Sequence, residues 1–243
     1  MRAPLVHARG RSASIPHDFE ATQPVRTPAM NRILLATVLL AVSTLPAACK
    51  STEGHDRAKD TADQVVEVGG AAGQTQLRLD NTLAALEQVV ATAQQNPKPA
   101  FDTFVKEYGA FSDELADLTK QREALKTKAE SWFTEFEKQN EAIQDPDLRK
   151  AGAKRLAEFR EEVKGVSKQV DELMSGTTAL HGRLKDVRTF LGNDLTAKGI
   201  ETVSGRIADA AKEGRKFAAG LGKLSKSSEE LASKMRAAQK PAQ

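Results

Sequence analysis

The stretch FDTFVKEYGAFSDELADLTKQREALKTKAESWFTEFEKQNEAI, residues 101–143, decides the fold of this chain. Its apolar residues recur at alternating steps of three and four: Phe101, Phe104, Tyr108, Phe111, Leu115, Leu118, Leu125, Ala129, Trp132, Phe136 and Ile143. Two polar residues, Arg122 and Gln139, interrupt the series. Such spacing, kept over about six heptads, predicts one long helix with an apolar seam of the coiled-coil type.

Two further seams follow after Pro146. The first comprises Leu156, Phe159, Val163, Val166, Val170, Leu173, Thr177, Leu180, Leu184, Val187 and Leu191, and the second Ile200, Val203, Ile207, Ala210, Gly214, Phe217, Leu221, Leu224, Ser228, Leu231 and Met235. They are out of phase because nine residues separate Leu191 from Ile200. We expect a turn in this gap, with Gly192 as the C′ residue and Asn193-Asp194 as an N-cap. Asp145-Pro146 predicts another N-cap, with proline at the first helical position.

The segment at about residues 56–95 has the weakest pattern. Its apolar residues are Val65, Val68, Ala72 and Leu79 in one phase, then Leu83, Leu86, Val90 and Ala93 after a stutter. Gly69, Gly70 and Gly73 weaken a helix by roughly 0.5–1 kcal/mol each relative to alanine. Two interpretations remain open at this stage: a flexible hinge, or close approach to another helix through small residues.

The four segments predict an all-α fold. With 5% aromatic and 28% charged residues, the composition favours long helices over a thick globular core. Short connections require neighbouring helices to run antiparallel, so we expect an elongated up-down-up-down four-helix coiled-coil bundle over residues 56–236. The alternative is a pair of hairpins that bury their remaining faces in a homo-oligomer. We expect the tail, residues 237–243, to fray because it has no large apolar residue.

The amino-terminal part contains a signal-peptide pattern at residues 30–48. Asn31 and Arg32 precede an apolar run of about 13 residues, which is too short for the ~20 that span a bilayer as a helix. Pro46-Ala47-Ala48-Cys49 resembles a bacterial lipobox, although leucine is usual where Pro46 stands. We therefore expect cleavage between Ala48 and Cys49 and a lipid on Cys49. The alternative is an ordinary signal peptide with an incidental cysteine.

The regions flanking this signal are polar. Residues 49–55 predict a short leash between the anchor and the bundle. Lys50 after Cys49 favours the outer membrane, facing the periplasm, over the inner membrane. Residues 1–29 have prolines, arginines and no periodicity, which indicates a mis-called start or a disordered extension. A transit peptide is the alternative, and Asp18 and Glu20 weaken it.

The chemistry-bearing residues predict no active site. The single cysteine cannot form an intramolecular disulfide, and the four histidines, His7, His17, His55 and His181, lack paired ligand spacing, so we expect neither metal nor cofactor. Carboxylates alternate with lysine and arginine at helical spacing, which is typical of solvated faces. The net charge of +3 is small and its signs are interleaved, so we expect no nucleic-acid partner. Arg122 in the seam either fixes helix register or extends its charge to the edge.

Three stretches resemble a bacterial family catalogued as domain of unknown function 2959, predicted envelope proteins of coiled-coil character. They are ESWFTEFEKQ (130–139), DLRK (147–150) and LKDVRTFLGNDLTAKGI (184–200). In the last, the residues similar to the family pattern are Asp186, Phe190, Leu191, Leu195, Ala197 and Ile200. Gly192-Asn193-Asp194 departs from it, since a lysine and a histidine are expected before the asparagine. The resemblance implies no catalytic residues.

These observations together predict a non-enzymatic, lipid-anchored protein of the bacterial envelope. Its membrane contact is the lipid on Cys49, and its bundle acts as a periplasmic spacer or protein-docking surface. Two other hypotheses remain: a membrane-surface or lipid-binding and remodelling module, and an adaptor of an envelope transport complex.

Overall fold

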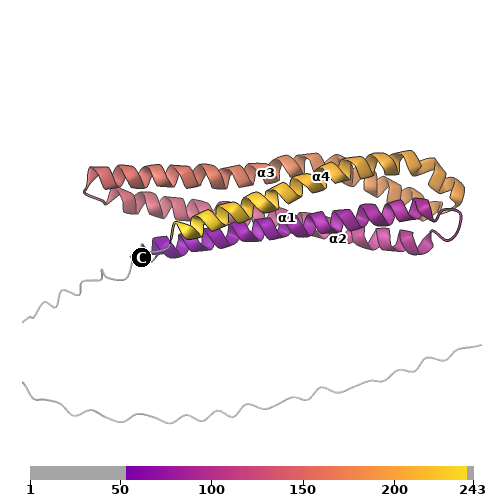
Figure 1. The fold of residues 1–243 in the computed structure, drawn as a ribbon, viewed down its shortest axis with the longest axis horizontal. Coiled ribbons are helices and arrows are strands. Elements are labelled where there is room, and N and C mark those ends of the chain that lie inside the picture. The colour runs from indigo at the N-terminus through magenta and orange to yellow at the C-terminus, as the bar shows by residue number, and fades with distance from the viewer. Residues whose placement is uncertain (1–52, 240–243) are drawn as a thin grey trace, which may run out of the picture. The chain divides into compact units, whose positions relative to one another are not determined.

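The computed structural model describes residues 53–239, which form four α-helices (Figure 1). The helices are α1 (Glu53–Ala91), α2 (Lys98–Glu141), α3 (Pro146–Asn193) and α4 (Ala197–Ala237). They contain 39, 44, 48 and 41 residues. At about 1.5 Å of rise per residue, each is roughly 60–70 Å long. The predicted all-α bundle of four long helices is confirmed.

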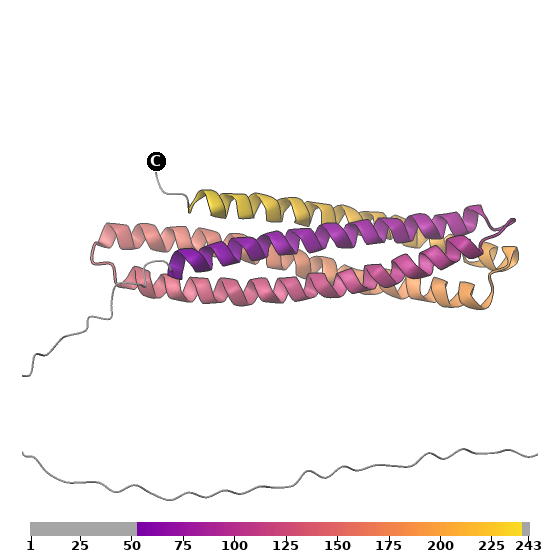
Figure 2. The same ribbon diagram turned by 90° about the horizontal axis from the view of Figure 1, so that it is seen from below.

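The helices form an antiparallel ring. α1 packs against α2 and α4, and α3 packs against the same two helices on the other side. Figures 1 and 2 show the four helices side by side along one axis, with α1 and α3 running opposite to α2 and α4. Because the connections are short, the chain passes up and down the bundle in sequence order, as the seam pattern predicts.

The seams meet in a core that consists of two clusters, one after the other along the bundle. The first cluster joins the start of α1, the second half of α2, the first half of α3 and the end of α4. The second joins the remaining halves and reaches the α1–α2 and α3–α4 connections. The half-buried side chains of Met174 and Phe217 pack against both clusters. Each helix therefore contributes its apolar stripe to both halves of one continuous core.

The glycines of α1 serve close packing, which decides between the two interpretations of this segment. α1 runs unbroken through Gly69, Gly70 and Gly73. A Cβ atom on Gly69 would lie 2.9 Å from the Ser228 Cβ and 3.2 Å from the Ser225 carbonyl oxygen, both on α4. A Cβ atom on Gly70 would meet nothing within 4 Å. Gly69 thus brings α1 and α4 together, whereas Gly70 faces away from the interface.

The predicted seam of α1 is wrong at its end and too narrow. Val90 is 37% exposed, and its neighbour Val89 is fully buried instead. The stutter rotates the apolar stripe, so a step of three from Leu86 leads inward and a step of four leads outward. Polar side chains are also buried on α1, namely Thr61, Gln64, Thr75 and Thr82. α1 is enclosed by α2 and α4, so its buried face is wider than a coiled-coil seam.

The helix caps confirm one prediction and correct another. The Asp145 side chain accepts hydrogen bonds from the backbone N–H groups of Asp147 (2.8 Å) and Leu148 (3.1 Å), as an N-cap does. At the connection between α3 and α4, however, Gly192 lies inside α3, and Thr196 is the N-cap of α4. The prediction of an Asx-type N-cap at Asn193-Asp194 was wrong, because the Asp194 carboxylate instead accepts a hydrogen bond from the Thr196 hydroxyl at 2.6 Å.

Both ends of the bundle extend beyond the predicted limits. α1 begins at Glu53, so the last three residues of the expected leash are helical. α4 ends at Ala237, and Ala238 of the expected fraying tail packs against the first core cluster. The Ala238 carbonyl oxygen accepts a hydrogen bond from Arg155, which links the end of α4 to α3. The predictions for residues 1–52 and 240–243, including the signal peptide, lie outside the described residues.

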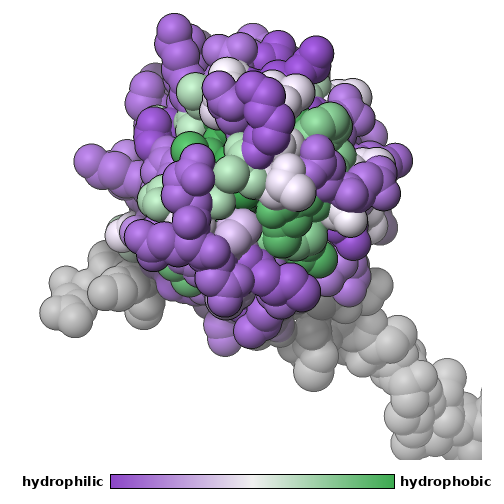
Figure 3. Space-filling view, turned by 90° about the vertical axis from the view of Figure 1, so that its right-hand side faces the viewer, coloured by the Kyte–Doolittle hydropathy of each residue, from purple (hydrophilic) through white to green (hydrophobic). Residues whose placement is uncertain are grey.

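The surface of the bundle is mostly hydrophilic. Figure 3 shows one end of the bundle, where a few hydrophobic patches lie among charged and polar residues. Ion pairs link neighbouring helices along the sides, including Arg183 with Glu213 and Arg160 with Glu137. None of the four described helices is long and apolar enough to cross a membrane.

Candidate functional site: a cavity at the end of the bundle

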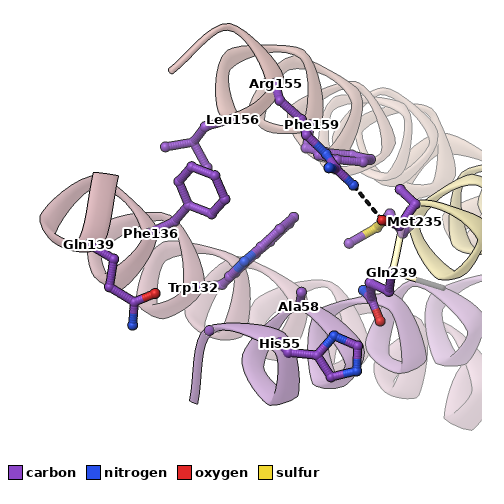
Figure 4. Close-up of a pocket in the computed structure, with 12 residues that line it drawn as sticks. His55, Ala58, Trp132, Phe136, Gln139, Arg155, Leu156, Phe159, Met235 and Gln239 are labelled. Atoms are coloured by element: carbon purple, nitrogen blue, oxygen red, sulfur yellow. Dashed lines mark hydrogen bonds between the residues drawn. The ribbon is translucent and has the colours of Figure 1, made fainter. Parts of the chain in front are cut away.

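A cavity of about 290 Å³ lies at the end of the bundle where α1 begins. All four helices contribute to it. Its apolar lining consists of Ala58 from α1, Trp132 and Phe136 from α2, Leu156 and Phe159 from α3, and Met235 from α4. Figure 4 shows these side chains around open space. The first core cluster therefore ends in a hollow, not in a filled layer.

The lining side chains are mostly shielded from solvent although they are not fully packed. Trp132 is 4% exposed and Leu156 is 3% exposed. The Trp132 and Phe159 ring centroids lie 5.7 Å apart at 50°, so the two rings form a tilted wall. A side chain beside a void loses the dispersion contacts that a neighbour would supply. The cavity is thus a place where an apolar group would gain contacts without displacing a side chain.

Polar groups surround the apolar interior. Gln139, Gln239, His55 and Arg155 complete the lining together with Gly54 and Ala238. An Arg155 Nη2 donates to the Ala238 carbonyl oxygen at 2.5 Å, the bond drawn in Figure 4. The Arg155 Cζ also lies 5.8 Å from the Phe159 ring centroid. Arg155 therefore holds the end of α4 against α3 and places a positive charge beside the apolar lining.

A second cluster of polar side chains lies in the other half of the bundle, between α2 and α3. The His181 Nε2 is 3.0 Å from the Tyr108 hydroxyl and 3.0 Å from the Ser112 Oγ. The Ser112 hydroxyl also donates to the Tyr108 carbonyl oxygen at 2.9 Å. Burial raises the pKa of Tyr108, and the Ser112 hydrogen bond and the Arg188 charge offset this only in part. Within residues 53–239, the side-chain hydrogen bonds of His181 go to Tyr108 and Ser112.

Arg122, the charged residue in the seam of α2, reaches across to α3. Its Nη2 donates to the Asp171 carboxylate at 2.6 Å, and it also pairs with the adjacent Glu123. The Arg122 side chain is 22% exposed. Burial lowers its pKa, but the Asp171 hydrogen bond and the charges of Asp171 and Glu123 outweigh burial, so the net pKa is raised. A role of Arg122 in helix register stays a prediction.

Arg122 also borders a groove between α2 and α3. The groove has a volume of about 490 Å³ and an apolar floor that includes Phe133 and Val163. Its cationic residues are Arg122, Lys126, Arg160, Lys164 and Lys168, and its anionic ones are Glu130 and Asp171. The groove is therefore an amphipathic surface with an excess of positive charge.

Of the site residues predicted from the sequence, Arg122 is the one that the structure describes. Ala48 and Cys49 lie outside the described residues, and Cys49 precedes the start of α1 by four positions. Among the described residues, no group of three or more histidine, cysteine, aspartate or glutamate side chains is placed to hold a metal ion.

The cavity itself was missed in the sequence. Trp132 and Phe136 occupy seam positions, which predicted core packing, and Trp132 does contact the core. The signal that could have indicated a hollow is an imbalance of size: α2 and α3 contribute large aromatic residues to the cavity lining, whereas the apolar side chain from α1 is that of Ala58. The spacing of apolar residues along the sequence does not give the distance between helix ends. This imbalance therefore indicates a hollow only once the arrangement of the four helices is known.

The comparisons with known proteins give a family and no activity. A family model described as "Protein of unknown function (DUF2959)" matches residues 48–235. This range includes all but the last residues of the bundle, and it contains every helix that lines the cavity. No curated protein and no solved structure matches the chain.

Proposed function

Because the chain belongs to the DUF2959 family, whose description names no activity, we propose a function from the architecture: a non-enzymatic, lipid-anchored bacterial envelope protein. Its bundle serves as a spacer or protein-docking surface in the periplasm, and Cys49 carries the anchor. The observation that carries this proposal is the uninterrupted helical bundle that starts four residues after the single cysteine. Four helices of ~60–70 Å with one shared core form a long rod, which suits a spacer that separates two structures by a fixed distance.

Support for the anchor comes from the residues before the bundle. The apolar run Ile33 to Leu45 followed by Pro46-Ala47-Ala48-Cys49 is typical of lipoprotein signals, with the departure at Pro46. The net charge of the chain is only +3, so overall charge provides little attraction to a lipid surface, and an anchor would keep the bundle at a membrane.

Metabolic labelling tests the anchor. Cells that express the chain are grown with an alkyne-bearing fatty acid, and the label on the purified protein is measured. We expect label on the wild type and none on Cys49→Ser. Lys50→Ser, a change at the next residue, should keep the label. An unlabelled wild type would mean that Cys49 is incidental and that the signal is an ordinary cleaved one.

A second candidate function has one observation in its favour. The groove between α2 and α3 combines an apolar floor with an excess of cations, a combination that binds anionic lipid surfaces. Co-sedimentation with anionic liposomes separates the candidates, using the chain from residue 49 with Cys49→Ser. A spacer stays in the supernatant, whereas a membrane-surface module sediments and loses this property in Lys164→Gln/Lys168→Gln.

A further inference from the structure

We propose that the cavity at the start of α1 binds a single fatty acyl chain, with its alkyl part among Trp132, Phe159 and Met235 and its carboxylate or ester group beside Arg155. This binding site does not depend on the spacer function or on a lipid at Cys49. It rests on three features of the cavity: its size, its lining and the charge at its opening.

The size of the cavity fits one alkyl chain. Its volume is about 290 Å³. An apolar cavity of about 150 Å³ holds a benzene molecule, which has six carbon atoms. By this comparison, the cavity at the end of the bundle accommodates about ten to twelve carbon atoms. One medium-length acyl chain meets this limit, whereas a pair of chains does not fit.

The lining suits an alkyl chain better than a polar ligand. The interior presents rings and aliphatic groups from all four helices, and the buried part contains Trp132, Leu156, Phe159 and Met235. Of these, the Met235 side chain is unbranched and polarizable, so it adapts to flexible apolar partners. Of the polar residues of the lining, His55 and Gln239 lie near the two chain ends of the bundle, Gln139 lies on α2 and Arg155 on α3. The cavity therefore has an apolar interior and a polar opening, as an amphiphile requires.

The charge at the opening specifies the head group. Arg155 forms no ion pair in the part of the chain that the structure describes, and its hydrogen bond goes to a neutral carbonyl oxygen of Ala238. Arg155 is also the arginine of the cavity lining. Two other arginines near this end already have carboxylate partners, since Arg160 contacts Glu137 and Arg236 contacts Asp63. A guanidinium without a carboxylate partner favours an anionic or carbonyl group, to which it donates charge-assisted hydrogen bonds.

The position of the cavity offers two sources for the chain. Gly54 and His55, at the start of α1, line it, and Cys49 is four residues before α1. Four residues span at most roughly 14 Å, so an acyl group on Cys49 reaches the opening. A free fatty acid from the surroundings is the other source. Both present the same alkyl chain to the same lining.

Trp132 is the only tryptophan of the chain, so its fluorescence reports on the cavity alone. The test uses the chain from residue 49 with Cys49→Ser, since all four helices and both core clusters lie within residues 53–239. The probe is dodecanoic acid brominated at its methyl end, added below its critical micelle concentration. We expect saturable quenching of Trp132 that unbrominated dodecanoic acid reverses. Quenching that does not saturate or is not reversed would overturn the site.

Two variants test the interior and the head group. Ala58→Phe fills the cavity from α1, so we expect at least tenfold weaker binding while the helical circular dichroism is retained. Arg155→Gln should weaken binding of dodecanoic acid about tenfold and leave binding of the neutral dodecanol unchanged. Lys150→Gln removes one charge from the same end of α3 and should change neither. Equal weakening of acid and alcohol by Arg155→Gln would contradict the placement of the head group.

The source is decided with the wild-type chain purified from membranes. If the acyl group on Cys49 occupies the cavity, the brominated acid quenches the Cys49→Ser chain and not the wild type. If the wild type is quenched equally, the site takes free fatty acid. Absence of quenching in both would refute the acyl-chain site and would leave the labelling result for Cys49 unaffected, so the two proposals fail separately.

Discussion

Tyr108 is a residue whose chemistry depends on the fold, because its hydroxyl is buried between α2 and α3. Its ordinary pKa is 10.0, and burial raises it in the bundle. Since the folded chain then keeps the proton that the unfolded chain loses, stability is unaffected below about pH 10 and falls as pH rises from there through the folded pKa.

Tyr108 is also the only tyrosine, so the ultraviolet absorbance of its phenolate reports this titration without overlap. We expect a midpoint above 10.0 in the folded chain and a return toward that value in denaturant. Denaturant unfolding at increasing pH should show a falling free energy of unfolding in the wild type. In Tyr108→Phe this fall with pH should be smaller. A midpoint at or below the ordinary value would contradict the buried environment.

Arg122 shows what the sequence can and cannot indicate about one residue. Its charge in an apolar series identified it as unusual, and the structure pairs it with Asp171. The partner was not predictable, because Asp171 lies on another helix and no periodicity relates the two positions. His181 is similar, since its contacts with Tyr108 and Ser112 depend on the alignment of α2 with α3.

At the scale of the helices, α2, α3 and α4 were predictable because their large apolar residues repeat with the heptad. α1 was less so, because small and polar residues form much of its buried face. Thr75 illustrates the reason: its hydroxyl donates to the Ala71 carbonyl oxygen at 2.8 Å within its own helix, and it is fully buried. A polar residue whose hydrogen bond is satisfied locally can lie in a core, and spacing alone does not reveal this.

The glycines of α1 give a matched pair for testing its contact with α4. Gly70→Ala should raise the free energy of unfolding by about 0.5–1 kcal/mol, because alanine favours the helix and its Cβ meets no atom within 4 Å. Gly69→Ala gains the same helix propensity, but its Cβ would be 2.9 Å from the Ser228 Cβ and 3.2 Å from a backbone oxygen.

The α4 atoms that a Cβ on Gly69 would contact include a backbone oxygen, which cannot move aside as the end of a flexible side chain can. Overpacking of this kind costs typically 1–3 kcal/mol, so we expect a net loss of roughly 0.5–2 kcal/mol for Gly69→Ala. Denaturant unfolding followed by circular dichroism measures both variants. A change of the same sign in the two would show that α1 and α4 are not in close contact at this position.

For the molecule as a whole, stiffness depends on whether the two core clusters act as one. The ion pairs between helices are mostly exposed, as for Arg183 with Glu213, and such pairs stabilise little. The apolar seams of the helices therefore contribute most of the stability of the bundle. Met174 and Phe217 pack against both clusters, and the Phe217 ring meets Phe111 edge-on with centroids 6.5 Å apart.

Phe217→Ala should weaken the link between the halves while the interior of each cluster stays packed. We expect a loss of roughly 1–3 kcal/mol, below the usual 3–5 for a buried phenylalanine because Phe217 is half-buried. Hydrogen exchange should then give separate opening free energies for the two halves, where the wild type gives one. Phe101→Ala is the control, because Phe101 is also half-buried but packs against the second cluster only. If Phe217→Ala left the halves exchanging together, their coupling would reside in the continuous helices, and a spacer would keep its stiffness without this contact.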